Sequence, residues 1–67
     1  MTCPVSSMTR DEVRNECKVR MGEDETNLNA ALTEYALKLK FTDNDAQKLR
    51  LPTLKVILKH LRILSAS

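Results

Sequence analysis

A chain of 67 residues has room for one domain, because a protein of this size buries only about 60% of the surface that its unfolded chain exposes. Its one glycine, two prolines and two cysteines exclude a turn-rich β-sandwich and a disulfide-rich scaffold. The net charge of +2 is unevenly distributed: residues 1–34 carry four cations and seven carboxylates, whereas residues 35–67 carry seven cations and two carboxylates. Such asymmetry favours an anionic partner, or head-to-tail association between copies; the alternative is that the charges of a small domain are unevenly distributed by chance.

The N-terminal residues lack the basic and apolar regions of a secretory signal peptide. No stretch approaches the roughly 18 consecutive apolar residues of a membrane span. Cys3 and Cys17 are expected to be reduced thiols of an intracellular protein, cytoplasmic or nuclear, and a disulfide between them is the alternative. We therefore expect no membrane span, a flexible tail over residues 1–8, and a single helical domain over residues 9–67.

The first helix is predicted over residues 10–21, where the chain carries its clearest local signal. Thr9 and Glu12 have the spacing of a capping box, in which each side chain bonds the backbone N–H of the other residue. Gly22 is expected to end the helix, because glycine tolerates the left-handed conformation that follows many helices. The apolar stripe that begins at Val13 is narrow, so we expect this helix to bury only one edge.

Two further helices are predicted in the middle of the chain. One covers residues 27–40, after a cap at Asp24 or Thr26, and carries apolar side chains on two of its sides, which favours a central position. The next covers residues 43–50, where Thr42 has the position of an N-cap.

The last helix is predicted over residues 52–64, since proline suits the first turn of a helix. Most of its apolar side chains fall within an arc of roughly 140°, which we expect to be core. These residues are Leu51, Leu54, Ile57, Leu58, Leu61 and Leu64. With short connections that favour antiparallel neighbours, the pattern predicts an all-α fold: a small bundle of three to four helices.

The last helix carries more apolar surface than one buried face requires. Val56 and Ile63 form a second ridge outside the core arc, and Leu37 and Phe41 lie on a second side of the central helix. Because so short a chain gains little from its own core, we hypothesise that these residues contact a protein partner or make the protein a homo-oligomer. The alternative is that Val56 and Ile63 pack beneath the N-terminal tail, against Val5.

Basic side chains on the last helix support a second hypothesis, in which the protein binds duplex nucleic acid. Lys55, Lys59 and Arg62 form a stripe, and Lys48 and Arg50 precede it. Contact with a duplex backbone is favoured over single-strand recognition, because this stretch has no aromatic residue on which bases could stack. An acidic protein or an anionic lipid surface is a third candidate for the same cations.

The sequence offers no arrangement typical of catalysis. His60 is the only histidine and has no Cys or Ser close to it in sequence, so we expect a solvated side chain. One His and two scattered Cys fall short of the four ligands of a structural zinc site. A bundle this small also has difficulty enclosing a ligand pocket of a few hundred Å³. We predict a non-enzymatic protein without cofactor, metal or small-molecule substrate.

The C-terminal segment LPTLKVILKHLRILSAS, residues 51–67, resembles the first half of a SAP motif, a helix–extended–helix module that binds DNA. The similar features are an initial hydrophobe, the Leu54-Lys55 pair, a further Leu and basic residue, and the small polar residues at the end. Arg62 stands where the motif has a Gly, and the motif's second helix is not in the sequence. The resemblance implies that this segment takes part in DNA binding.

Overall fold

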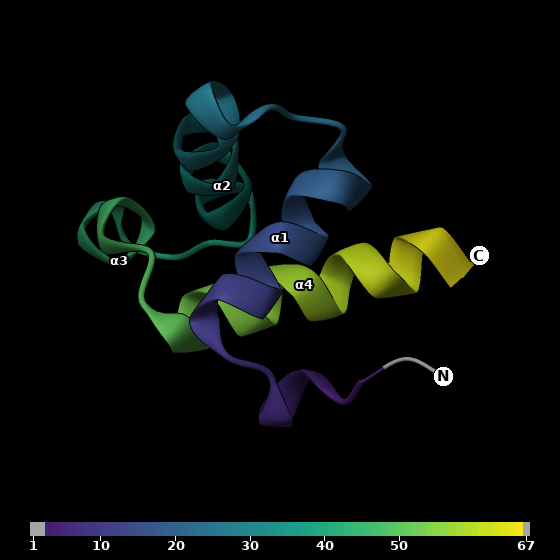
Figure 1. Ribbon diagram of the computed structural model, residues 1–67. Helices are drawn as coiled ribbons and strands as arrows, with labels where there is room; N and C mark the ends of the chain where they lie inside the picture. The colour runs from purple at the N-terminus through teal and green to yellow at the C-terminus, as the bar shows by residue number, and fades with distance from the viewer. Residues whose placement is uncertain (1–2, 67) are drawn as a thin grey trace.

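The structure of this protein is a computed structural model that describes residues 3–66, and these fold into helices with no strand. One turn of 3-10 helix, η1 (Val5–Ser7), precedes four α-helices. The α-helices are α1 (Arg10–Met21), α2 (Glu25–Lys38), α3 (Asp43–Lys48) and α4 (Leu51–Ala66), as drawn in Figure 1. The all-α prediction is confirmed, and α1 has the predicted bounds.

The start of α1 is fixed by the capping box that the sequence predicts. The backbone N–H of Thr9 donates to Glu12 Oε1 at 2.8 Å, and the backbone N–H of Glu12 donates to Thr9 Oγ1 at 3.3 Å. Gly22 follows the helix with φ of 68° and ends it in the left-handed conformation. Both local signals are confirmed.

Helix α2 is shifted toward the N-terminus by two residues at each end relative to the prediction. Asp24 is the cap, since its Oδ1 accepts from the backbone N–H of Asn27 at 2.9 Å. At the other end Lys40 adopts a left-handed φ of 70°, and the N–H of Phe41 donates back to the carbonyl of Ala36 at 3.1 Å. The sequence does not indicate this helix end, because a lysine occupies a position where glycine is usual.

Helix α3 is capped by Thr42, whose Oγ1 accepts from the backbone N–H of Asp45 at 3.2 Å, as predicted. It ends two residues earlier than predicted, because Leu49 adopts a left-handed φ of 47°. Helix α4 then begins at Leu51, with Pro52 in its first turn. It continues without a break through Arg62, the residue at the Gly position of the SAP motif.

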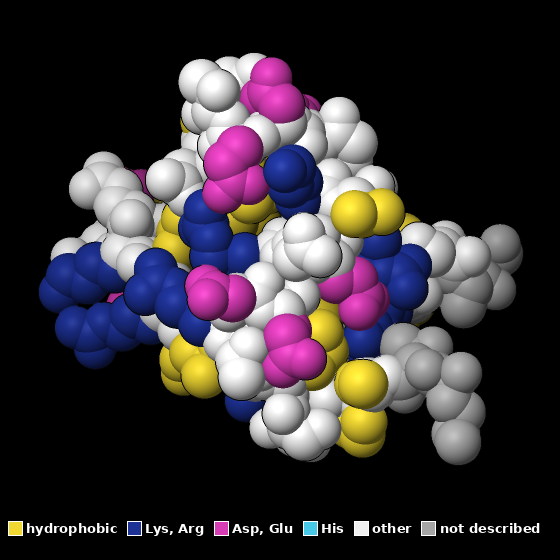
Figure 2. Space-filling view, in the orientation of Figure 1, with side chains coloured by type: hydrophobic (Ala, Val, Ile, Leu, Met, Phe, Trp, Pro, Cys, Tyr) yellow, Lys and Arg dark blue, Asp and Glu magenta, His cyan; other side chains and the backbone are white. Residues whose placement is uncertain are grey.

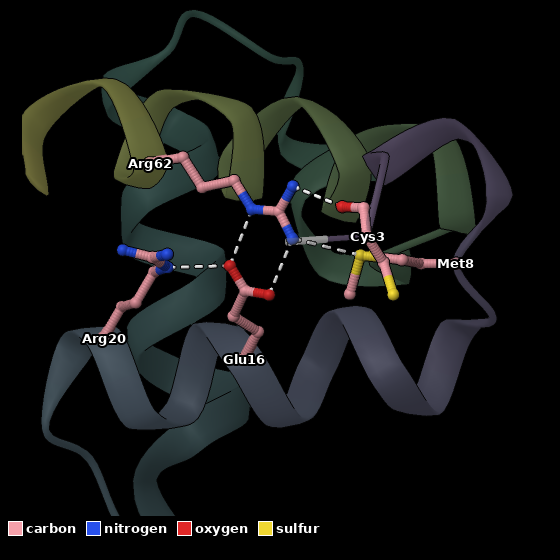
Figure 3. Close-up of polar contacts among 5 residues, drawn as sticks. All are labelled: Cys3, Met8, Glu16, Arg20 and Arg62. Atoms are coloured by element: carbon pink, nitrogen blue, oxygen red, sulfur yellow. Dashed lines mark hydrogen bonds and ion pairs between the residues drawn. The ribbon is translucent and has the colours of Figure 1, made fainter. Parts of the chain in front are cut away.

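The most extensive helix contact joins α1 to α4, and α2 packs against both α3 and α4. Figures 1 and 3 show α1 and α4 running side by side in the same general direction, while α2 crosses them steeply. The largest interface is therefore between parallel helices that are distant in sequence, whereas short connections led us to expect antiparallel neighbours. The side chains of the α1–α4 core include Val13, Cys17, Leu54, Ile57 and Leu58, all fully buried.

The N-terminal segment, predicted as part of a flexible tail, packs against α4 from Cys3 onward. Val5 is 6% exposed and Met8 8% exposed, and both belong to the hydrophobic core. Lys55 Nζ donates to the carbonyl oxygen of Ser6 at 3.0 Å. Residues 1 and 2 of the predicted tail lie outside the described residues.

The predicted core arc of α4 is correct except at its ends. Leu51 is only half-buried, and Leu64 is 56% exposed because it lies in the last turn, where α4 projects beyond the other helices in Figure 1. Thr53, a polar residue of the same helix, is also buried. The arc residues that the core does bury are Leu54, Ile57, Leu58 and Leu61.

Candidate interaction surface

The second apolar ridge of α4 lies on the surface. Val56 is 44% exposed and Ile63 is 67% exposed. The N-terminal segment does not cover them, because it binds the side of α4 that carries Lys55 and Arg62. The alternative in which Val56 and Ile63 pack against Val5 is therefore wrong, although Val5 itself is buried.

Two polar residues flank this ridge. At 100° per residue, Lys59 lies about 40–60° from Val56 and Ile63 on one side, and His60 lies about 40–60° from them on the other. Lys59 is exposed and makes no hydrogen bond or ion pair with any residue of the described part of the chain. The ridge thus carries an unneutralised cation along one edge.

His60 differs from its prediction, because it is half-buried and bound to α2 rather than solvated. Its Nδ1 forms a hydrogen bond with the hydroxyl of Tyr35, and the two rings are tilted by 58° with centroids 5.6 Å apart. Burial raises the pKa of the Tyr35 hydroxyl, which keeps it a phenol able to donate to the imidazole. This contact joins α2 to α4 beside the ridge.

The four predicted protein-contact residues do not form one surface. Leu37 is 43% exposed, but it follows Tyr35 by two residues and so lies about 200° further round α2, away from the side that meets α4. Phe41 is half-buried and packs against the hydrophobic core. Only Val56 and Ile63 share a face, and we call this pair, with Lys59 at its edge, the α4 ridge.

Arg62, predicted as a cation free to bind phosphate, is instead engaged within the fold (Figure 3). Its Nε and Nη2 donate to the two carboxylate oxygens of Glu16, each at 2.7 Å, in the bidentate geometry typical of strong Arg–carboxylate pairs. Nη1 donates to the carbonyl oxygen of Cys3 at 2.7 Å, and Nη2 also approaches Met8 Sδ at 3.4 Å. Its charge is neutralised, so the prediction is corrected at this residue.

The carboxylate of Glu16 is held ionised by this arrangement. Its hydrogen bonds from Arg62 lower the pKa of Glu16 to about 2, and Arg20 Nε adds a further bond at 2.7 Å. The same pairing raises the pKa of Arg62. Sequence reasoning missed Glu16 because its partner lies 46 residues away and no local pattern links them.

The remaining candidate cations lie at the start of α4 and just before it. Lys48, Arg50 and Lys55 have no ion-pair partner among residues 3–66, and Lys48 and Arg50 are exposed. Figure 2 shows Lys and Arg side chains gathered at the end of the molecule where α3 meets the start of α4. Residues 46–67, which include this end and the α4 ridge, contain no Asp or Glu.

A surface hollow of about 320 Å³ lies between α1 and the start of α2, and it is open to solvent rather than enclosed. Its lining carries both signs of charge, and Arg14 in that lining contacts two residues of α2. Arg14 Nη1 donates to Asn29 Oδ1 at 2.7 Å, and Arg14 Nη2 lies 4.0 Å from Glu25 Oε1. The cation in the lining is therefore paired with residues of α2. Its lining residues are Asp11, Arg14, Asn15, Glu25 and Leu28.

Both cysteines are free thiols, with Cys3 exposed and Cys17 buried. Burial, with a smaller contribution from the neighbouring Glu16 charge, raises the pKa of Cys17 to about 11. Within residues 3–66 no three His, Cys, Asp or Glu side chains are grouped as a metal site would require. Of the helices in that range, none has the length and apolar character needed to cross a lipid bilayer.

Comparison with known proteins gives no relative: no protein-family model, no curated protein and no solved structure matches this chain.

Proposed function

We propose that this protein is a small, non-enzymatic helical interaction module that docks on another chain, or on a second copy of itself, through the α4 ridge. The observation that carries the proposal is that α4 has two apolar faces, of which the fold buries only one. Leu54, Ile57 and Leu58 are fully buried on one face of α4, while Val56 and Ile63 remain exposed on another. These two large apolar side chains are seven residues apart on one helix face, and helix-in-groove recognition uses anchor residues at this spacing.

The chemistry of the reactive side chains supports a role without catalysis. The imidazole of His60 is engaged by Tyr35, and Cys17 is a buried thiol whose pKa of about 11 disfavours the nucleophilic thiolate. The ion pair between Glu16 and Arg62 joins three segments of the fold and leaves its carboxylate ionised. We place the module inside the cell, because free thiols are typical of reducing compartments.

Replacing Val56 by Asp tests the proposal, with Leu37→Asp as a matched control because Leu37 is equally exposed on a different helix. Sedimentation of the wild-type protein over a range of concentrations reports self-association. Affinity purification from cells that express the protein, followed by mass spectrometry, reports other partners. We expect one of these associations to survive in Leu37→Asp and to be lost in Val56→Asp. A wild-type protein whose associations are the same in both variants contradicts the proposal.

A second candidate function is binding to duplex DNA through Lys48, Arg50, Lys55 and Lys59. It is supported by the absence of carboxylates after Asp45 and by the lack of ion-pair partners for these four cations in the described structure. The resemblance of residues 51–67 to half of a SAP motif favours the same function. Arg62 is no longer part of this candidate site, since Glu16 neutralises it.

A titration of duplex DNA at several salt concentrations tests this alternative. Four phosphate contacts predict that the logarithm of the association constant falls with the logarithm of salt with a slope of about −3.6. Replacing Lys48 and Arg50 by Gln should reduce the slope to about −1.8, whereas replacing Arg62 should leave it unchanged. Absence of binding at about 50 mM salt excludes the alternative.

A further inference from the structure

The charge around the α4 ridge narrows the kind of partner that could occupy it. Lys59 lies exposed at the edge of the ridge, and Lys55 lies one turn earlier, where its Nζ donates to the carbonyl oxygen of Ser6. Neither lysine has an ion-pair partner among the described residues. Residues 46–67 contain no Asp or Glu, and Glu16, which contacts α4 from α1, is engaged by Arg62 and Arg20. An occupant of the ridge therefore meets an apolar strip bordered by positive charge, and an apolar strip bordered by carboxylates is its electrostatic complement.

A second copy of this chain is a poor match to the ridge. The midpoint between Val56 and Ile63 falls between residues 59 and 60. In an antiparallel pairing, a two-fold axis through that midpoint would bring Lys59 next to its own symmetry mate. In a parallel pairing, each Lys59 would face the flank of the other copy that carries His60, and that flank offers no carboxylate. Like charges placed opposite each other in an interface oppose association.

The size of the ridge also limits the occupant. A stable protein–protein interface covers about 800 Å² on each partner, which would be roughly a sixth of the 4575 Å² surface of this protein. The ridge offers two apolar side chains and one cation on a single helix, which suits a short helical segment that binds transiently.

We propose that the α4 ridge is a receptor for an acidic amphipathic helix of another protein, a proposal that rests on the docking role proposed above for α4. The apolar residues of the bound helix would contact Val56 and Ile63, and its carboxylates would contact Lys59 and Lys55. The apolar strip supplies affinity, and the lysines fix the orientation and exclude basic helices. The occupant is identified by chemistry alone: a helix with one apolar stripe and Glu or Asp on one flank.

Two fluorescein-labelled helical peptides of the 16-residue length of α4 serve as probes. Both carry the same Leu stripe; one has Glu on its flanks and the other has Lys. We expect the Glu peptide to bind the intact protein at least about tenfold more tightly than the Lys peptide at about 50 mM salt, and to lose affinity as salt rises. Amide chemical-shift changes should be centred on Val56, Lys59 and Ile63.

Matched variants show whether binding uses the ridge. Val56→Ser and Lys59→Glu should each weaken the Glu peptide by about tenfold, whereas Leu37→Ser should change its affinity by less than about twofold. Stronger binding of the Lys peptide, no binding of the Glu peptide, or equal affinities in Val56→Ser and wild type would overturn the inference. So would duplex DNA that displaces the Glu peptide from the same amides. A homodimer broken by Val56→Ser would overturn this inference while supporting the docking role.

Discussion

At the scale of single residues, Glu16 joins the two ends of the chain to the first helix. Its carboxylate accepts both Nε and Nη2 of Arg62, and Arg62 in turn holds the Cys3 carbonyl of the N-terminal segment. The side chain of Glu16 is only 23% exposed, so solvent screens these bonds less than those of a typical surface pair. Its contribution to stability should depend on pH because the pKa of the carboxyl is lowered to about 2.

Glu16→Gln should lower the free energy of unfolding by about 1–2 kcal/mol near neutral pH, since it removes a charge-assisted bidentate pair. A carboxyl whose pKa is about 2 when folded and about 4.3 when unfolded contributes fully above the higher value. That contribution disappears as pH falls toward the lower value. Urea unfolding at a series of pH values should therefore show the wild type and Glu16→Gln converging in acid. A constant difference across the series contradicts the assignment.

Lys40→Gly should stabilise the protein by about 0.5–1 kcal/mol, because Lys40 adopts a left-handed φ of 70° that glycine occupies without strain. Gly22→Ala is the matched opposite change. Gly22 has nearly the same φ of 68°, and a methyl group there meets no atom within 4 Å. Any loss of stability in Gly22→Ala therefore comes from backbone strain rather than from a steric clash. Thermal unfolding should move the two midpoints in opposite directions. A lower midpoint for Lys40→Gly would refute the account.

At the scale of helices, the sequence predicts starts better than ends. Thr9, Asp24 and Thr42 each cap a helix through a side-chain oxygen, and residues with such oxygens in these positions are recognisable in a sequence. Of the internal helix ends, only the one at Gly22 is marked by a residue type. The ends at Lys40 and Leu49 use the left-handed conformation in residues that rarely adopt it, so composition gives no warning.

Two leucines of α4 that share the predicted core arc should respond differently to truncation. Leu58→Ala should cost about 2–5 kcal/mol, because the side chain is fully buried and a cavity would remain. Leu64→Ala should cost less than about 0.5 kcal/mol, because Leu64 is 56% exposed. Chemical denaturation of both variants measures the difference. Equal losses would mean that the last turn of α4 is packed in solution.

At the scale of the molecule, the sequence does not say which helices meet. Glu16 bonds Arg62 across 46 residues and Tyr35 bonds His60 across 25, and neither pair leaves a local pattern. The exposed Val56–Ile63 ridge could be predicted because one helix carried two apolar faces. Its grouping with Leu37 and Phe41 could not be tested by periodicity, since the relative orientation of α2 and α4 is set by packing.

The packing of the N-terminal segment predicts unequal reactivity of the two thiols. Cys3 is exposed and should react rapidly with Ellman's reagent, whereas Cys17 is fully buried and should react only when the fold opens. Val5→Ser should speed the reaction of Cys17, because Val5 is 6% exposed within the same core cluster. Its replacement weakens the packing of the N-terminal segment on that core. Two equally fast thiols in the wild type would contradict the burial of Cys17.

The pairing of the first long helix with the last has a consequence for the nascent chain. Val13 and Cys17 are covered only once α4 has been made, and roughly 45 residues separate the end of α1 from the end of α4. At ribosomal rates of about 5–20 residues per second, α1 waits about 2–9 s with its apolar stripe uncovered. During translation that stripe is accessible to chaperones until α4, made after α2 and α3, can pack against it.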